Sequence, residues 1–309
     1  MPRILFAALA HRWAEWEADL RAAFAETGLD IELGTEFPPE TVDYVVYAPN
    51  SDVHDFTPFT CLKAVQNLWA GVENVVGNPT LKVPLLRMVD PGLTEGMVEW
   101  VTGHVLRHHL GIDACLSAQS GSWEKYIPPL ARDRRVGVLG LGELGAATAK
   151  ALSALNFDVA GWARRPKDLP GLTCLSGEAG LAEILDRSEI LVLLLPLTAE
   201  TENLIDAAAL NRLPKGAVLL NPGRGGLVDD AALLAALDSG NLAHATLDTF
   251  RTEPLPLDDP FWTHERVTVT PHIASETRPA TASRVVAENI RRGEAGEPFL
   301  HVVDRKAGY

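Results

Sequence analysis

The segment that most constrains this chain is a short apolar run that leads into three glycines and then into a helix-forming stretch. It reads Val136-Gly-Val-Leu-Gly140-Leu-Gly142-Glu-Leu-Gly145, and residues 146–155 follow. Here Gly140 would allow a tight turn, Gly142 would let backbone approach a pyrophosphate, and Gly145 would let the helix pack closely on the strand. The first amides of the helix would then face the anion. This order predicts a dinucleotide site, although glycines alone would also fit an ordinary strand–helix turn.

Short apolar segments alternate with helix-like segments after this motif, and the alternation indicates the fold class. Expected strands cover residues 136–139, 159–162, 190–195, 217–220, 243–247 and 267–270, and residues 172–175 could form a further short one. Several of these segments are apolar at consecutive positions, which suits strands buried on both faces of a parallel sheet. Strand–helix alternation of this kind predicts a doubly wound α/β fold.

The part of the chain before the motif has its own strand and helix pattern, so we predict two domains. Residues 4–9 and 42–47 are expected strands, and a helix over 13–26 would end at Gly28. A helical pattern over 93–118, weakened at Gly111, and a looser stretch over 120–134 lead into the motif. A helix over 275–293 could return to the first domain. We therefore expect one domain of residues 1–92 plus 284–309, with a dinucleotide-binding domain of residues 93–283 inserted in it.

Charge and hydropathy restrict the partners of the protein. The formal net charge is −14, which argues against nucleic acid and against an anionic membrane surface, because both require a positive protein surface. A few arginines in a cleft could still bind an anionic substrate. No apolar run reaches the ~20 residues of a membrane span, and the first residues do not resemble a signal peptide.

The number and spacing of the cysteines indicate the cellular compartment of the protein. Cys61, Cys115 and Cys174 are far apart and form no metal or redox spacing. Such a sparse, odd set is typical of reduced thiols in an intracellular protein, and we expect these thiols to be buried. The predicted location is the cytoplasm.

Polar residues follow several of the predicted strands directly. Arg224 follows the strand at 217–220, Asp248 and Glu253 follow the strand at 243–247, and His272 follows the last strand. Ligands of doubly wound sheets bind outside the carboxyl ends of the strands. We therefore expect these four residues to converge on one edge of the sheet.

Each of these residue types suits a different chemical task. Arg224 has glycines around it and could hold a carboxylate with two parallel hydrogen bonds, which lysine cannot do. His272, with an unperturbed pKa near ~6.5, could exchange a proton at neutral pH, and Glu253 is the candidate to raise that pKa. Asp248 could orient the nicotinamide end of a cofactor or the loop, and aspartate at a strand end is also a common turn residue.

The residues at the end of the second strand of the nucleotide domain indicate which dinucleotide the protein prefers. NAD-preferring sites usually carry an acidic residue about 20 positions past the glycine loop. The sequence here is Trp162-Ala-Arg164-Arg165, with no acidic residue before Asp168. Two arginines would bind a 2′-phosphate, so we predict that NADP(H) is preferred and that NAD(H) remains possible. A basic surface turn is the alternative.

Two further histidines could suggest a metal site, but we do not predict one. His104 and His108 are four positions apart in the helical pattern over 93–118 and could bind a metal together. No acidic or cysteine partner stands at a recognisable ligand spacing. We interpret both residues as partly exposed histidines on a helix.

Several motifs together resemble the D-isomer-specific 2-hydroxyacid dehydrogenase family, and within it the A-type glyoxylate/hydroxypyruvate reductases. The resemblance covers nearly the whole chain. Besides Gly140 to Gly145, it depends on Leu195-Pro-Leu-Thr-Ala-Glu-Thr201, Leu220-Asn-Pro-Gly-Arg-Gly225, Leu247-Asp-Thr-Phe-Arg-Thr-Glu-Pro254, Pro271-His-Ile-Ala274 and Val303-Asp-Arg-Lys-Ala-Gly-Tyr309. The implied fold class is α/β, with two doubly wound, Rossmann-like domains of parallel sheets. The nucleotide-binding domain is inserted into a flavodoxin-like substrate domain.

The resemblance also implies roles for individual residues. Arg224, Glu253 and His272 would be the catalytic set, the amides of Ala70 and Gly71 would bind the substrate carboxylate, and Arg87 would reach the active site. The family usually has a small residue before Ala-Gly, where this chain has Trp69, so Trp69 is expected to reshape the substrate pocket. The residues expected at the cofactor are Gly140, Gly142, Glu143, Leu144, Gly145, Arg164, Arg165, Leu195, Pro196, Pro222, Gly223, Asp248 and His272.

The implied activity is NADPH-dependent reduction of a small 2-oxo acid, glyoxylate or hydroxypyruvate, to glycolate or glycerate. Hydride transfer would be accompanied by proton donation from His272, and the substrate would bind between the domains. One alternative is a reductase of a larger 2-oxo acid, and another is a nucleotide-sensing relative without activity. Family dimers suggest a homodimer formed through the long helix over 93–118, although a helix buried within one chain would show the same pattern.

Overall fold

The chain folds into two compact units. The computed structural model describes residues 1–119, 121, 123, 125 and 127–309. Unit 1 comprises Met1–Leu93 and Thr277–Tyr309, and unit 2 comprises Thr94–Glu276. The return to unit 1 therefore falls at Thr277 and not at the predicted residue 284. The physical reason is local, because the Thr277 hydroxyl donates a hydrogen bond of 2.8 Å to the Leu68 carbonyl within unit 1.

Unit 1 is built on a parallel sheet of five strands. Their order is β2 (Glu32–Gly34), β1 (Arg3–Ala7), β3 (Tyr44–Tyr47), β4 (Ala64–Asn67) and β5 (Leu85–Leu86). This is the flavodoxin-like order. The sequence predicted β1 and β3 but none of the other three strands. Strands β2 and β5 are too short to show an apolar pattern, and β4 ends in the polar residues Gln66 and Asn67.

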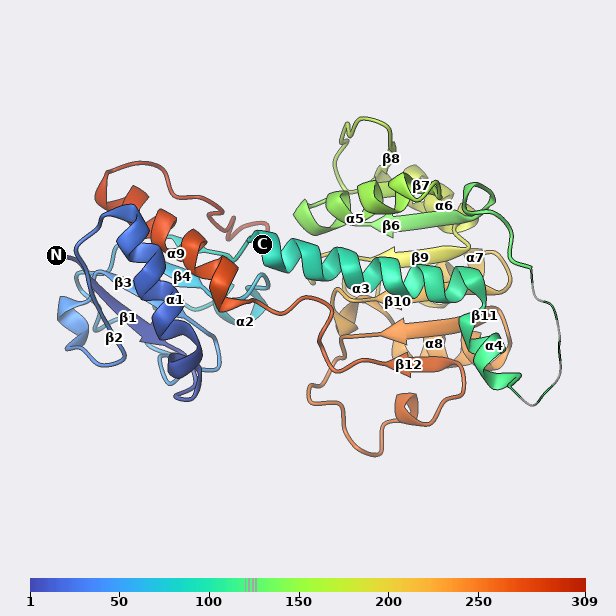
Figure 1. The fold of residues 1–309 in the computed structure, drawn as a ribbon, viewed down its shortest axis with the longest axis horizontal. Coiled ribbons are helices and arrows are strands. Elements are labelled where there is room, and N and C mark those ends of the chain that lie inside the picture. Colours follow the sequence, from blue (N-terminus) through green and yellow to red (C-terminus); the bar gives the residue numbers. More distant parts are fainter. Residues whose placement is uncertain (120, 122, 124, 126) are drawn as a thin grey trace. The chain divides into compact units, whose positions relative to one another are not determined.

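Helices and the chain end cover the two faces of this sheet. Helix α1 (Arg12–Thr27) packs against α9 (Pro279–Glu294), and the two lie side by side in Figure 1. As predicted, α1 ends at Gly28, whose φ of 71° is left-handed. A separate hydrophobic core of unit 1 contains Val65 of β4, Val75 of α2 (Glu73–Val76) and Val303 of the C-terminal segment. Residues distant in sequence thus form one unit.

Unit 2 contains a seven-stranded parallel sheet with a change of strand order in its middle. The order is β12 (Val267–Val269), β11 (Leu242–Leu247), β10 (Ala217–Asn221), β9 (Ile190–Leu193), β6 (Arg135–Leu139), β7 (Asp158–Ala163) and β8 (Thr173–Ser176). Chain progression reverses between β6 and β9, and ligands of such sheets bind at this point. The predicted fold class, two parallel-sheet α/β domains, is confirmed.

Helices lie on both faces of this sheet. Helices α3 (Pro91–Leu110) and α5 (Glu143–Ala154) share one core with β6, β9 and β10, and Figure 1 shows α3 along the sheet. Helices α6 (Gly177–Arg187), α7 (Ala207–Arg212) and α8 (Asp230–Asp238) share a second core with the sheet.

Gly111, with a φ of 66°, separates α3 from α4 (Ile112–Ser117) as predicted. Residues 120, 122, 124 and 126 of the predicted loose stretch lie outside the described residues. No described helix is both long and apolar enough to cross a membrane.

The cysteines do not lie in the core, contrary to our expectation. Cys61 and Cys115 are exposed, and Cys174 is partly exposed. Cys61 belongs to the segment before β4, and Cys115 lies on α4, where few side chains cover it. Only Cys174, on the edge strand β8, contacts apolar core residues.

Candidate active site

The glycine turn after β6 has the geometry that a dinucleotide requires. Gly140 has a φ of 103°, and a Cβ there would lie 2.4 Å from the Leu194 carbonyl oxygen. A Cβ on Gly145 would lie 1.7 Å from the Gly140 oxygen. A Cβ on Gly142 would meet nothing within 4 Å. Packing inside the protein therefore explains Gly140 and Gly145, whereas the open space at Gly142 fits a ligand that approaches the backbone.

Helix α5 begins directly after this open space. Gly142 is its N-cap and supplies no side-chain cap, so within the described residues the first-turn amides of Glu143 and Leu144 are not capped by a side chain. Uncapped amides at the start of a twelve-residue helix favour an anion. Glu143 and Leu144 thus lie where a pyrophosphate would be held.

Two arginines follow β7 at the neighbouring strand end. Arg164 and Arg165 are both exposed. The Arg164 guanidinium forms an ion pair with Glu200, which lies in the turn after β9. Residues 164–167, which follow β7 directly, include no acidic side chain, but Glu200 lies beside Arg164 and offsets part of its charge.

The loops after β9 and β10 pack closely beside the glycine turn. Pro196, whose carbonyl accepts a hydrogen bond from the Thr201 hydroxyl at 2.7 Å, follows Leu195. Gly223, which follows Pro222, leaves no room for a side chain, since its Cβ would lie 2.8 Å from the Leu193 oxygen. The predicted cofactor residues of these loops therefore lie around one edge of the sheet.

Arg224 is positioned by the turn after β10. The Asn221 side chain donates a hydrogen bond of 2.9 Å to the Arg224 carbonyl, and one Arg224 Nη1–H donates to the Gly223 carbonyl at 2.7 Å. Gly225 lets this turn touch the loop after β11, because a Cβ there would lie 2.1 Å from the carbonyl carbon of Phe250. This close approach brings the Arg224 charge near Glu253 and His272. The charge favours the ionised form of Glu253 and works against the rise in the pKa of His272.

His272 and Glu253 form a hydrogen-bonded pair. The distance between His272 Nδ1 and Glu253 Oε2 is 2.7 Å, and the other carboxylate oxygen accepts the Phe250 amide at 2.8 Å. The hydrogen bond to Glu253 raises the pKa of His272 against the opposing effect of burial. Burial alone would raise the pKa of Glu253, but the His272 and Phe250 hydrogen bonds and nearby positive charges lower it overall. The His272 side chain remains 49% exposed, so its ring can be reached from solvent.

Asp248 holds the backbone on which His272 is mounted. Asp248 is fully buried, and its carboxylate accepts the amides of Ile273 and Ala274, each at 2.9 Å, and the Thr270 hydroxyl at 2.6 Å. The His272 amide donates to the Asp248 carbonyl at 2.9 Å. These bonds keep His272 at a φ of 53°, which is uncommon for a residue other than glycine. Of the two roles left open for Asp248, the structure shows the contacts of a loop anchor.

In unit 1, the predicted substrate residues gather at the ends of β4 and β5. Trp69, which is 38% exposed, Ala70 and Gly71 follow β4. Arg87 follows β5, and its amide donates to the His301 carbonyl at 3.0 Å. The Met88 amide donates to the Trp69 carbonyl at 3.1 Å, so the two segments are hydrogen-bonded to each other.

The histidines of α3 have structural contacts. His108 Nε2 lies 2.9 Å from the Thr246 hydroxyl, and His104 is partly exposed. The next residue after His108, His109, is buried against Phe157. In the part of the chain that the structure describes, no three His, Cys, Asp or Glu residues are grouped in a way that could hold a metal ion.

Sequence reasoning missed the side chains that support the site. Thr270 and Asn221 hold the two loops of unit 2, and Asn67 holds the loop after β4, where its side chain donates to the carbonyls of Trp69 and Gly71. For Asn221 and Thr270 the available signal was a polar residue at the end of a predicted apolar strand, whereas β4 itself was not predicted and gave no signal for Asn67.

A doubly wound sheet with a glycine turn at its switch point defines a dinucleotide-binding α/β protein. The family profile of the D-isomer specific 2-hydroxyacid dehydrogenase NAD binding domain matches residues 103–274, more than half of the chain. The chain therefore belongs to the D-isomer specific 2-hydroxyacid dehydrogenase family, whose members are NAD(P)-dependent oxidoreductases.

Individual relatives agree with this assignment. The glyoxylate/hydroxypyruvate reductase A of Salmonella heidelberg is 40% identical over 256 residues, 80% of this chain and 82% of the relative. A D-isomer specific 2-hydroxyacid dehydrogenase from Xanthobacter autotrophicus Py2, solved with NADPH and MES, is 43% identical and covers 100% of this chain and 99% of its own, with a TM-score of 0.93. The NADPH-dependent glyoxylate/hydroxypyruvate reductase of Sinorhizobium meliloti, solved with NADP and sulfate, is 34% identical and covers 100% of both chains, with a TM-score of 0.87.

Proposed function

We propose that this protein reduces a small 2-oxo acid, glyoxylate or hydroxypyruvate, to the 2-hydroxy acid with NADPH. The observation that carries the proposal is the 2.7 Å contact between His272 and Glu253 at the edge of a dinucleotide-binding sheet, with the Arg224 charge nearby. This set combines a proton donor, the carboxylate that keeps it charged, and an anchor for a carboxylate substrate.

NADP(H) is the proposed cofactor, and NAD(H) remains possible. Arg164 and Arg165 stand at the end of β7, where a 2′-phosphate would meet two guanidinium groups. Two relatives that span the whole chain were solved with NADPH or NADP. The open space at Gly142 and the uncapped start of α5 suit the pyrophosphate.

The proposed substrate carries a carboxylate next to its carbonyl group. Arg224 would bind the carboxylate in bidentate fashion, with Arg87 and the amides of Ala70 and Gly71 as further donors. Trp69 replaces the small residue usual in the family, and its partly exposed indole would limit the size of the substrate. The Salmonella and Sinorhizobium relatives are named for glyoxylate and hydroxypyruvate, which are small enough for such a pocket.

In the proposed reaction, a 2-oxo acid, NADPH and one proton give the 2-hydroxy acid and NADP⁺. NADPH, when bound, supplies the hydride to C2. Because His272 Nδ1 contacts Glu253, Nε2 is the ring nitrogen left to donate the proton to the carbonyl oxygen. Glu253 keeps the ring protonated and oriented, and Arg224 offsets the negative charge that develops on the oxygen.

The test is the loss of nicotinamide absorbance with glyoxylate and with hydroxypyruvate, run side by side with NADPH and NADH. Fast loss with NADPH and slow loss with NADH is the expected result. Comparable rates with both cofactors would contradict the assignment of Arg164 and Arg165. A preference for larger 2-oxo acids would contradict the substrate proposal, and tight cofactor binding without any turnover would favour the sensor alternative.

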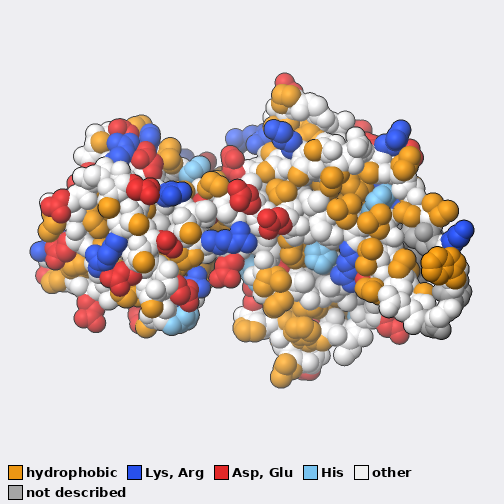
Figure 2. Space-filling model, in the orientation of Figure 1, with side chains coloured by type: hydrophobic (Ala, Val, Ile, Leu, Met, Phe, Trp, Pro, Cys, Tyr) orange, Lys and Arg blue, Asp and Glu red, His pale blue; other side chains and the backbone are white. Residues whose placement is uncertain are grey.

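A homodimer is the proposed assembly. The end of α3, α4 and the segment after it expose apolar side chains, namely Leu110, Ile112, Leu116, Trp123, Ile127 and Leu130. Figure 2 shows hydrophobic side chains gathered in this region. Exposed apolar groups in such number are typical of an interface. Light scattering should give twice the chain mass for the wild type, and L116K should shift the protein toward monomer.

The proposed location is the cytoplasm. Cys61 and Cys115 are exposed free thiols, and such thiols persist best in a reducing compartment. A fluorescent fusion and cell fractionation would test this.

A further inference from the structure

We propose that Asn67 positions the substrate-binding loop by fixing the Trp69–Ala70 peptide so that the Ala70 amide points outward. This inference depends on the proposed function, in which the Ala70 and Gly71 amides bind the substrate carboxylate. Asn67 is the last residue of β4 and is fully buried. It is therefore a positioning residue, without contact to substrate.

The Asn67 side chain makes two hydrogen bonds to the loop that follows β4. Its Nδ2 donates hydrogen bonds to the carbonyls of Trp69 at 2.8 Å and Gly71 at 2.9 Å. Both partners are acceptors, so the nitrogen of the amide must be the atom that faces the loop. One side chain thus fixes two carbonyls of the loop.

The planarity of the peptide bond carries this constraint to the Ala70 amide. In a trans peptide the C=O and the following N–H point in opposite directions. Because the Trp69 carbonyl points toward the buried Asn67, the Ala70 N–H points away from it. Within the described part of the chain, neither the Ala70 nor the Gly71 amide donates a hydrogen bond, and both residues are partly exposed. The loop therefore presents donors to solvent or to a ligand.

A second bond reinforces the same peptide. The Met88 amide donates to the Trp69 carbonyl at 3.1 Å, so this oxygen accepts two hydrogen bonds. A flip of the peptide would leave two donors without this acceptor, and both Asn67 and Met88 are fully buried. An unpaired buried donor is costly, so the outward orientation is the stable one. Met88 directly follows Arg87, which couples the loop to the other proposed donor of unit 1.

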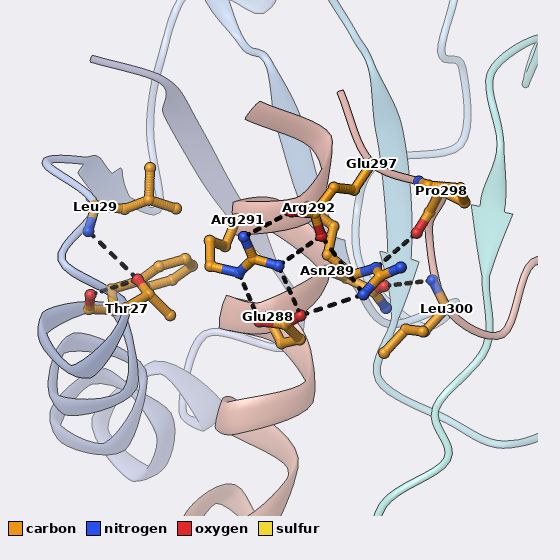
Figure 3. Close-up of polar contacts among 10 residues, drawn as sticks. Thr27, Leu29, Glu288, Asn289, Arg291, Arg292, Glu297, Pro298 and Leu300 are labelled. Atoms are coloured by element: carbon orange, nitrogen blue, oxygen red, sulfur yellow. Dashed lines mark hydrogen bonds and ion pairs between the residues drawn. The ribbon is translucent and has the colours of Figure 1, made fainter. Parts of the chain in front are cut away.

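Residues far away in sequence support the loop. The Thr277 hydroxyl donates to the Leu68 carbonyl at 2.8 Å across 209 residues of sequence. Gln66 Nε2 donates to the Asn67 carbonyl at 3.0 Å, and Gln66 Oε1 accepts from Asn289 of α9 at 2.7 Å. Asn289 also accepts the Leu300 amide at 2.8 Å, as Figure 3 shows. A buried chain of amide side chains thus links the C-terminal segment to the end of β4.

The test is the substitution N67D, which preserves shape but replaces the donor with an acceptor that faces two carbonyl oxygens. The loop should then populate the outward conformation less, and the apparent KM of the 2-oxo acid should rise about tenfold if a tenth of the molecules remain competent. The Kd of NADPH should stay within about twofold of the wild type, because the loop belongs to unit 1. The Ki of oxalate, a carboxylate that cannot be reduced by hydride, should rise with the KM.

The matched control is N78D. Asn78 also lies in unit 1 and donates one hydrogen bond to a backbone carbonyl, that of His54 at 2.8 Å. N78D should leave the KM of the 2-oxo acid unchanged. An unchanged KM in folded N67D, or equal changes in N67D and N78D, would overturn the proposal.

A measurement on the wild type keeps the proposal testable if N67D does not fold. In protein labelled with ¹⁵N-alanine, the Ala70 amide should shift when oxalate is added. A resonance of Ala70 that does not respond to saturating oxalate would overturn the proposal. Absence of turnover with any 2-oxo acid would contradict the proposed function instead, and the Ala70 shift would still test the loop.

Discussion

At the scale of single residues, the histidines of unit 2 show how one neighbour decides a protonation state. Burial lowers the pKa of His104, His108, His109 and His244. His272 is shifted in the opposite direction, because a carboxylate oxygen lies 2.7 Å from its ring. Histidine is therefore held neutral where burial dominates and is prepared to carry a proton where a carboxylate contacts its ring at the sheet edge.

This contrast predicts the pH dependence of the reaction. A reduction that needs protonated His272 should fail as pH rises through the raised pKa of this residue. In E253Q the neutral amide no longer favours the imidazolium, so the pKa of His272 should fall and the alkaline limit of kcat/KM should move to lower pH. A pH–rate profile measures this. A limit at the same pH in both proteins would show that Glu253 does not control His272.

Two residues at the end of β7 are predicted to set cofactor preference. The double variant R164A/R165A removes the charges that would face a 2′-phosphate, and each charged hydrogen bond is worth roughly 1.5–3 kcal/mol. The KM of NADPH should therefore rise by at least about tenfold, while that of NADH changes little. R187A is a suitable control, since Arg187 pairs with Asp158 at the opposite end of β7. Equal effects on the two cofactors would remove the 2′-phosphate assignment.

At the scale of elements, the turn between β6 and α5 separates a packing role from a binding role. A Cβ on Gly145 would overlap the Gly140 oxygen, whereas a Cβ on Gly142 would meet nothing within 4 Å, and Gly142 has a φ of −75° that alanine can adopt. G145A should therefore lower the urea midpoint of unfolding. G142A should unfold like the wild type but bind NADPH at least about tenfold more weakly, because its methyl group enters the space for the pyrophosphate. Normal NADPH binding by G142A would contradict this placement.

The contact between α3 and β11 is predicted to make stability depend on pH. The rings of His108 and His244 lie 4.9 Å apart, and burial and neighbouring positive groups lower their pKa values to about 3 and about 4. In the unfolded chain these groups titrate near ~6.5, so the unfolded state binds more protons below that pH. The free energy of unfolding should thus decrease as pH falls from about 6.5 toward 4.

Urea unfolding at pH 7 and pH 5 would measure this decrease. The difference should be smaller in H244Q, which cannot be protonated at this position. H11Q, which changes an exposed histidine before α1, should show the wild-type difference. An H244Q protein with the full wild-type difference would assign the pH dependence to other groups.

At the scale of the whole molecule, two separate cores predict an uneven response to cofactor. The glycine turn and both arginines belong to unit 2. NADPH at 100 times its Kd should stabilise the native state by about 2.7 kcal/mol by mass action. Hydrogen exchange should slow most at the carboxyl ends of β6, β7 and β9. NADH at the same concentration should stabilise less, and slowing that is centred elsewhere would contradict the proposed cofactor site.

The strands of unit 2 could be predicted from the sequence to within about two residues, whereas three strands of unit 1 could not. Strands such as β9 and β10 are buried on both faces and show as apolar runs. Strands β2, β4 and β5 have two to four residues, and β4 contains the polar Gln66 and Asn67. Their membership in the sheet depends on pairing with strands elsewhere in the chain.

The sequence by itself determined the α/β class, the glycine turn and the strand ends that carry Arg224, Glu253 and His272, because these features follow from local residue order and from the rule that ligands bind at the carboxyl ends of strands. Only the tertiary structure decided which side chains meet. The contact of His272 with Glu253 and the role of Asp248 as a loop anchor join residues that lie apart in the sequence. The bonds of Asn67 and Thr277 to the loop after β4, and the bond of Asn289 to Gln66 within β4, likewise depend on the packed fold. Hydrogen bonds depend on distances of about 3 Å, and only the packed fold sets such distances.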